Sequence, residues 1–210
     1  MSTVPIPVPV RPRRRPVAAG VALALAGVLL LAACGGDSSP TTTTASRPIG
    51  FKDVTPATIR PGDPVPAPTE PVVLTVTGRI GTTNVGDTLQ FDMPTLERLG
   101  LIEYRIDDKL AEGRVATFTG VPLQNLLDVA KPDAGATTLA TTALNDYTVD
   151  IPIADASKYP VLLATSVDGR RMPVDRYGPV RVIYPYGAYG LRPPAADEKL
   201  IWQLSTIEVR

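Results

Sequence analysis

The feature that most constrains this chain is an uninterrupted apolar run near its N-terminus. Residues 17–33 carry no charge, and Arg11, Arg13, Arg14 and Arg15 come shortly before them. A basic start, a short apolar middle and small residues at the end are the parts of a secretory signal. At about 17 residues, the run lies at the lower limit for a helix that spans a bilayer. We therefore expect the folded part to begin after this run and to be exported.

The apolar run ends in Leu31-Ala32-Ala33-Cys34, and this ending resembles a bacterial lipobox. The resemblance implies that residues 1–33 are a removable signal peptide and that Cys34 receives the lipid. The alternative is an uncleaved anchor helix with a chance cysteine. Both interpretations place the remainder on one side of a membrane, facing the periplasm or the cell exterior.

Two residue counts exclude whole classes of chemistry. The chain has no histidine, and Cys34 is its only cysteine. Nucleophiles of the Ser-His-Asp or Cys-His type are therefore excluded, as are zinc, copper and iron sites built on His or Cys. A lipidated cysteine also leaves nothing for a disulfide. We therefore predict no metal site. Any general acid–base catalysis would have to use a carboxylate, a lysine or a tyrosine.

The charge of the mature chain bears on its partners. Removing residues 1–33 removes four arginines and no acidic residue, so 17 basic and 21 acidic side chains remain, a net charge of −4. Binding to nucleic acid needs a positive surface, so we expect no nucleic-acid partner. The expected partners are the membrane, through the N-terminal lipid, and an envelope protein or a small anionic ligand.

Residues 34–71 are rich in proline and threonine and carry few large apolar side chains. Such a segment cannot bury enough surface to offset the entropy of ordering, and proline favours extended conformations. We predict a disordered tether that lifts the domain off the membrane. An alternative for Ile49-Gly50-Phe51 is that this patch docks onto the domain.

Residues 72–210 are long enough for one domain with a single core. Asp92 as N-cap, Pro94 in the first turn and Gly100 after the end predict a helix over 93–99. A second helix is expected over 121–130 and a single turn over 153–158. Alternating or β-branched segments predict strands at 72–77, 88–91, 102–106, 115–118, 137–144, 147–151, 161–167, 180–184 and 201–209. The fold class is therefore α+β, with a β-rich domain and a few short helices.

Three segments, taken in order and spacing, resemble a known family. They are residues 118–123 (Phe-Thr-Gly-Val-Pro-Leu), residues 168–185 with their Gly178-Pro179-Val180-Arg181, and the closing strand with Trp202. Together they resemble the molybdopterin-binding domain of sulfite-oxidase-type oxidoreductases. The resemblance implies a mixed-sheet fold over residues 72–210 and implies molybdopterin as a cofactor.

Departures from the family pattern concern the metal. Active members bind molybdenum through a cysteine between the first helix and the Phe-x-Gly-Val-Pro segment, and residues 101–114 hold none here. Tyr177 stands where members often have histidine, and Ile201 replaces the lysine of a Lys-Trp pair. Asp107 or Asp108 could offer oxygen to a metal, although a charged turn is their simpler role.

These departures lead us to expect no cofactor and a non-catalytic binding or accessory module. One alternative is a molybdopterin-dependent oxidoreductase with a non-thiolate metal site. Another is a lipoprotein that binds a small anion.

Residues 167–192 hold five arginines and only two aspartates. Guanidinium groups match phosphate and carboxylate geometry, tyrosines offer flat rings, and glycines let backbone N–H groups approach an anion. In the resembled family, this segment contributes to pterin binding. The candidate cofactor-binding residues are Arg181, Tyr184, Tyr186, Gly187, Arg170 and Arg171.

A purely structural role for the same residues stays open. Asp168-Gly169 suits a hairpin turn, which would leave Arg170 and Arg171 beside it in solvent. Arg181 would then pair with a carboxylate, and the tyrosines would cover the edge of a small core.

Overall fold

A computed structural model describes residues 47–108, 114–191 and 199–210 of the chain. The predicted signal peptide, Cys34 and the first part of the predicted tether lie outside the described residues. Within the described part, no helix is both long and apolar enough to cross a bilayer.

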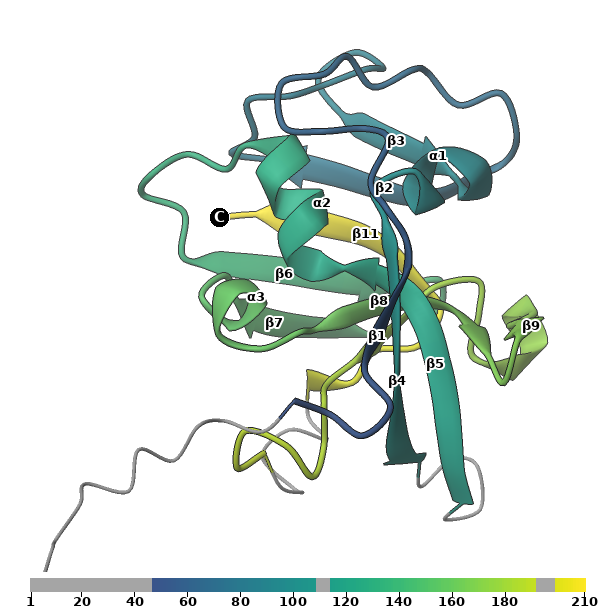
Figure 1. The fold of residues 1–210 in the computed structure, drawn as a ribbon. Coiled ribbons are helices and arrows are strands. Elements are labelled where there is room, and N and C mark those ends of the chain that lie inside the picture. The colour runs from purple at the N-terminus through teal and green to yellow at the C-terminus, as the bar shows by residue number, and fades with distance from the viewer. Residues whose placement is uncertain (1–46, 109–113, 192–198) are drawn as a thin grey trace, which may run out of the picture. The chain divides into compact units, whose positions relative to one another are not determined.

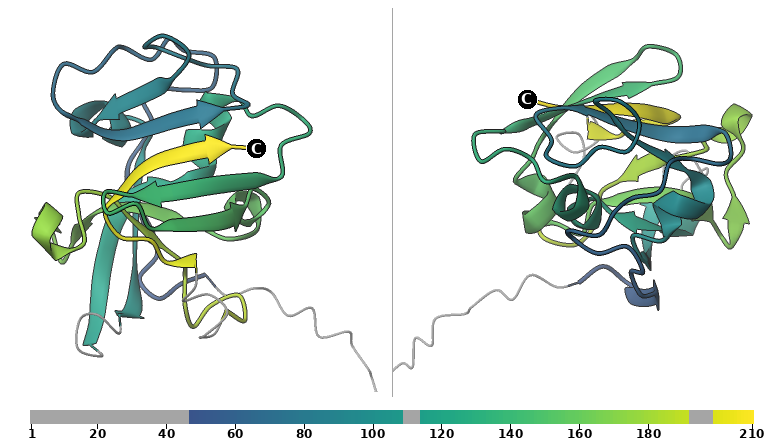
Figure 2. Two further views of the ribbon diagram at one scale, coloured as in Figure 1. Left: turned by 180° about the vertical axis from the view of Figure 1, so that it is seen from behind. Right: turned by 90° about the horizontal axis from the view of Figure 1, so that it is seen from above.

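The described strands form two sheets (Figures 1 and 2). In the first sheet, every pair is antiparallel. Its order is β1 (Lys52–Thr55), β4 (Leu101–Asp108), β5 (Arg114–Pro122), β8 (Leu162–Val167) and β10 (Arg181–Ile183), with β9 (Arg170–Arg171) also on β8. The second sheet is mixed, because β2 and β11 run parallel. Its order is β3 (Leu89–Asp92), β2 (Val72–Gly78), β11 (Leu204–Val209), β6 (Thr138–Ala143) and β7 (Thr148–Pro152).

The helices of the described part are short. They are α1 (Met93–Glu97), α2 (Leu123–Ala130), α3 (Asp155–Lys158) and a 3₁₀ turn, η2 (Val174–Arg176). Helix α2 turns Leu123, Leu126 and Leu127 into the larger core cluster, which also takes side chains from both sheets. A smaller cluster gathers Tyr104, Phe118 and neighbours from the first sheet. The α+β class and the β-rich mixed-sheet architecture are confirmed.

The nine strands expected from the sequence all have a counterpart, and each predicted helix is present in shortened form. Strands β1 and β9 were not expected. The closing strand begins at Leu204 instead of Ile201, because Gln203 takes a left-handed conformation with φ 53° that interrupts an extended chain.

The prediction of a disordered tether over 34–71 is wrong for residues 47–71. Strand β1 pairs with the outer edge of β4, and Ile59 and Val65 are buried in the larger core. The alternative for Ile49-Gly50-Phe51 describes this segment better, because the Ile49 carbonyl accepts a hydrogen bond from the Arg105 N–H at 2.8 Å. The composition of residues 47–71 did not show that they are structured, because the hydrogen bonds that hold β1 in place come from the edge of β4.

Gly120 shows why the Phe-x-Gly-Val-Pro segment needs its glycine. The β5–β8 register shifts between Thr119 and Gly120, and an added Cβ at Gly120 would lie 2.2 Å from the Leu163 carbonyl oxygen. That oxygen belongs to the backbone of a central strand, so it cannot move aside cheaply. Gly120 is therefore an architectural residue.

We expect Gly120→Ala to destabilise the protein by at least about 2 kcal/mol, because it overpacks a strand contact that has no room for a methyl group. Urea unfolding followed by circular dichroism measures this loss. Gly135→Ala is the matched control: an added Cβ there first meets the end of the Arg79 side chain, at 3.0 Å, and that side chain can move. Equal stability of the two variants would contradict the packing argument.

Asp92 is the N-cap of α1, as the sequence predicts, and it also ties down an earlier segment. Its Oδ1 accepts the Thr95 N–H at 2.9 Å, and its Oδ2 accepts the N–H groups of Thr69 at 2.8 Å and Glu70 at 3.2 Å. The carboxylate is 1% exposed. The Thr95 hydroxyl, followed by these backbone donors, holds the pKa of Asp92 well below its usual value despite burial.

Because the folded pKa is depressed, Asp92 contributes stability above the unfolded pKa, and this contribution is lost as the pH falls. We expect Asp92→Asn to lower the free energy of unfolding at neutral pH by about 2 kcal/mol, since the new amide faces N–H donors. The difference from the wild type should shrink from about pH 5 downward. Chemical unfolding across this pH range measures it, with the exposed Asp87→Asn as control. A difference that is independent of pH would contradict the assignment.

Candidate functional site

Arg181 lies inside the domain. It is on β10 opposite Ala164 of β8 and is only 1% exposed. Its guanidinium carbon lies 5.3 Å from the Phe118 ring centre and 5.6 Å from that of Tyr177. A cation that has been removed from water is stabilised by aromatic rings at such distances. Arg181 is therefore built into the packing of the first sheet.

Tyr184 follows β10 and is fully buried. Its hydroxyl donates to Asp155 Oδ2 at 2.8 Å, and Lys199 Nζ donates to the same oxygen at 2.7 Å. Burial, followed by the hydrogen bond to Asp155, raises the pKa of Tyr184 well above its ordinary value. Tyr184 thus remains a neutral donor that joins β10 to α3.

Arg171 forms an ion pair with Glu97 at the end of α1. Both guanidinium Nη atoms reach the carboxylate, with Nη2 2.6 Å from Glu97 Oε2, and the Thr165 hydroxyl donates to Oε1 at 2.7 Å. Burial alone would raise the pKa of Glu97, but the hydrogen bonds from Arg171 and Thr165 outweigh it and lower that pKa. This pair fastens the β8–β9 hairpin to α1.

The other candidates occupy more exposed positions. Arg170 lies on β9 opposite Val167, just after the Asp168-Gly169 turn, in which both residues have positive φ. Tyr186 is half-buried against both core clusters, and Gly187 is exposed with φ 79°. Arg170 and Arg171 therefore sit on a hairpin, whereas Arg181 and Tyr184 lie inside the domain.

Glu97, Asp155 and Lys199 are the partners that sequence analysis missed. Glu97 and Arg171 are 74 residues apart, and Asp155 and Lys199 are 44 apart. No local spacing connects residues so distant in the chain. Tyr177 and Trp202 likewise meet edge to face, with ring centres 4.9 Å apart.

The donor set of this chain does not fit a thiolate-bound molybdenum centre. The only cysteine is Cys34, outside the described residues, and the whole sequence lacks histidine. Within residues 47–108, 114–191 and 199–210, no three side chains of the His, Cys, Asp or Glu type gather as metal ligands. A soft metal that prefers sulfur finds no such ligand where the resembled family supplies one.

Comparison with protein families agrees with the fold. Residues 108–194 match the family described as the oxidoreductase molybdopterin binding domain. The matched range contains β5, α2, the β8–β9 hairpin and β10, and so includes all six candidate residues. A comparison with curated proteins gives no match. Residues 108–194 therefore match the oxidoreductase molybdopterin binding domain family, and they lie in a strand-rich, mixed-sheet architecture that is consistent with this family.

Proposed function

We propose that this protein is an exported, lipid-anchored member of the molybdopterin-binding domain family that acts as a non-catalytic binding or accessory module in the cell envelope. The observation that carries the proposal is the lack of side chains that could bind molybdenum through sulfur or imidazole. The family binds molybdopterin, but this sequence has no histidine, and its single cysteine lies at the end of the apolar N-terminal run. A lipid on Cys34 would occupy the one sulfur nucleophile of the chain.

The contacts of the candidate residues also support a non-catalytic role. Arg171 is committed to Glu97, and Tyr184 is committed to Asp155. The Arg181 guanidinium carbon lies 5.3 Å from the Phe118 ring centre and 5.6 Å from that of Tyr177. These contacts give the three residues a structural role in the domain.

The proposed partners follow from the anchor and the charge. The lipid would attach the chain to a membrane, facing the periplasm or the cell exterior. The net charge of −4 after removal of residues 1–33 disfavours nucleic acid and leaves an envelope protein or a small ligand as partner.

The metal content of the native protein tests the non-catalytic role. We expect the full chain, isolated from its own envelope, to carry molybdenum and pterin far below one equivalent, because no thiolate is present to hold the metal. Elemental mass spectrometry and pterin fluorescence measure both. A molybdenum enzyme isolated in parallel shows that the cofactor was available. Stoichiometric molybdenum would instead favour the oxidoreductase with a non-thiolate site, and loss of that metal in Asp107→Ala would locate its ligand.

The N-terminus of the isolated protein tests the anchor. We expect the mature chain to begin at a lipid-modified Cys34, and we expect Cys34→Ala to accumulate as a precursor that retains residues 1–33. Mass spectrometry of the intact protein and of its N-terminal peptide distinguishes the two forms. A wild-type chain that keeps residues 1–33 without lipid would support the uncleaved anchor helix and contradict the lipoprotein assignment.

A further inference from the structure

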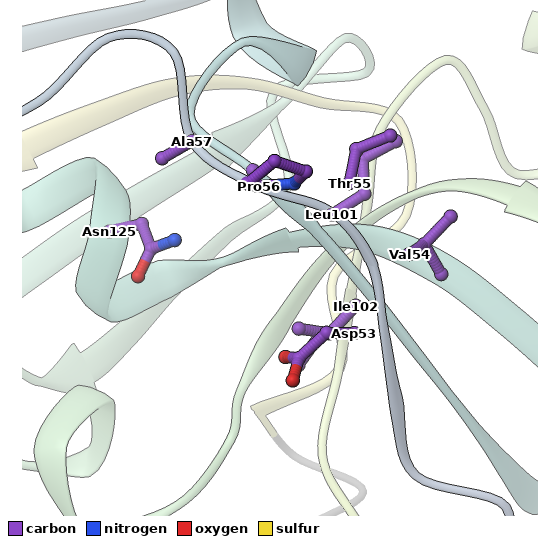
Figure 3. Close-up of a pocket in the computed structure, with 9 residues that line it drawn as sticks. Asp53, Val54, Thr55, Pro56, Ala57, Leu101, Ile102 and Asn125 are labelled. Carbon is purple, nitrogen blue, oxygen red and sulfur yellow. The ribbon is translucent and has the colours of Figure 1, made fainter.

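A surface hollow lies where the segment after β1 crosses the start of β4 beside helix α2 (Figure 3). Its volume of about 460 Å³ is within the range of small-molecule sites in proteins. Asp53 to Ala57 form one wall, Gly100 to Ile102 another, and Asn125 of α2 a third. The hollow lies outside the set of six candidate residues discussed above.

The wall formed by Asp53 to Ala57 is fixed at both of its ends. On one side, β1 pairs with β4 through Asp53 and Ile102. On the other side, the N–H groups of Thr58 and Ile59 donate to the Arg98 carbonyl at 2.8 and 3.0 Å. The hollow is therefore held open by paired backbone, and it is formed before any ligand arrives.

A β-bulge shapes this wall. Asp53 pairs with Ile102 and Thr55 pairs with Leu101, so Val54 is an extra residue in β1. A bulge of this kind bends a strand and re-aims its side chains. Val54 is 41% exposed and lines the hollow together with the apolar side chains of Pro56, Leu101 and Ile102. The hollow thus offers an apolar surface to a ligand.

Asp53 and Asn125 provide acceptor oxygens beside the Thr55 hydroxyl, which can donate or accept. The Asn125 Nδ2 donates to the Leu99 carbonyl at 2.8 Å, which fixes the amide orientation and leaves Oδ1 as an acceptor. The Asp53 carboxylate is directed toward the side of the hollow where α2 lies (Figure 3). Lys52, the neighbouring cation, pairs with Glu103 at 2.9 Å and not with Asp53. Within the described residues, Asp53 makes no side-chain hydrogen bond or ion pair.

We propose that this hollow binds an organic cation with an apolar stem, of the alkylguanidinium or alkylammonium class. The carboxylate of Asp53 supplies the opposite charge, Asn125 Oδ1 supplies a second acceptor, and the apolar wall covers the stem. An anionic ligand would be repelled by the Asp53 carboxylate, and a purely apolar one would leave that carboxylate desolvated without a partner. The cation has two chemical sources: a free small molecule, or an arginine or lysine side chain of another protein.

Titration calorimetry of the mature full-length chain in neutral detergent tests the proposal, with n-butylguanidinium chloride as probe. The matched control ligand is n-butylurea, which has the same shape without the charge. We expect butylurea to bind at least about tenfold more weakly, because it can donate hydrogen bonds to the Asp53 carboxylate but lacks the positive charge that attracts it. Rising ionic strength should weaken the binding of butylguanidinium.

Two variants locate the site. Asp53→Asn removes the charge and keeps the shape, and Val54→Lys places a resident cation at the rim. Both positions are exposed, so both variants should melt at the wild-type temperature while losing butylguanidinium binding about tenfold or more. Asp87→Asn, an exposed aspartate outside the hollow, is the control and should bind like the wild type.

The two sources are distinguished by a second probe, the blocked peptide acetyl-Ala-Arg-Ala-amide. Binding of the peptide without binding of butylguanidinium would assign the hollow to a protein side chain, and binding of both would show that a free cation suffices. Equal binding of butylguanidinium and butylurea, wild-type binding by Asp53→Asn, or no binding of either cation would overturn the proposal. None of these outcomes depends on the lipid or on the molybdenum content.

Discussion

The fold depends on the last strand of the chain, because β11 is the central strand of the second sheet. It runs parallel to β2 on one side and antiparallel to β6 on the other. The approach to β2 is so close that a Cβ at Gly78 would lie 2.3 Å from the Val209 carbonyl oxygen. Without β11, strands β2 and β3 would have no ladder connecting them to β6 and β7. The larger core is therefore complete only when the two ends of the domain meet.

Charged side chains join segments of the domain that are distant in the chain. Glu97 and Arg171 join α1 to a hairpin, and Asp155 joins α3 to both Tyr184 and Lys199. Buried charges persist where they are paired or hydrogen-bonded. In this chain, arginines and tyrosines in the family-matched segment contribute to the scaffold.

The sequence predicted most of the elements for clear physical reasons. Alternation identified strands such as β4 and β5, and Asp92 followed by Pro94 identified the start of α1. Strand β1 escaped prediction because its four residues are all exposed, so no burial pattern marks them, and the pairing edge belongs to another segment. The candidate site was predicted less well, because the sequence shows that arginines are frequent in this segment but not where each side chain points. Whether each one faces a ligand, a ring or a carboxylate depends on residues distant in the chain.

By itself, the sequence determined the chemical inventory: no imidazole, and one cysteine at the end of an apolar N-terminal run. These are properties of composition and local pattern, so they hold whatever the tertiary structure is. Only the tertiary structure decided that Arg171 meets Glu97, that Arg181 lies over the rings of Phe118 and Tyr177, and that Asp53 and Asn125 border one hollow. Each of these contacts joins segments that strand pairing and core packing bring together, and no spacing along the chain encodes them.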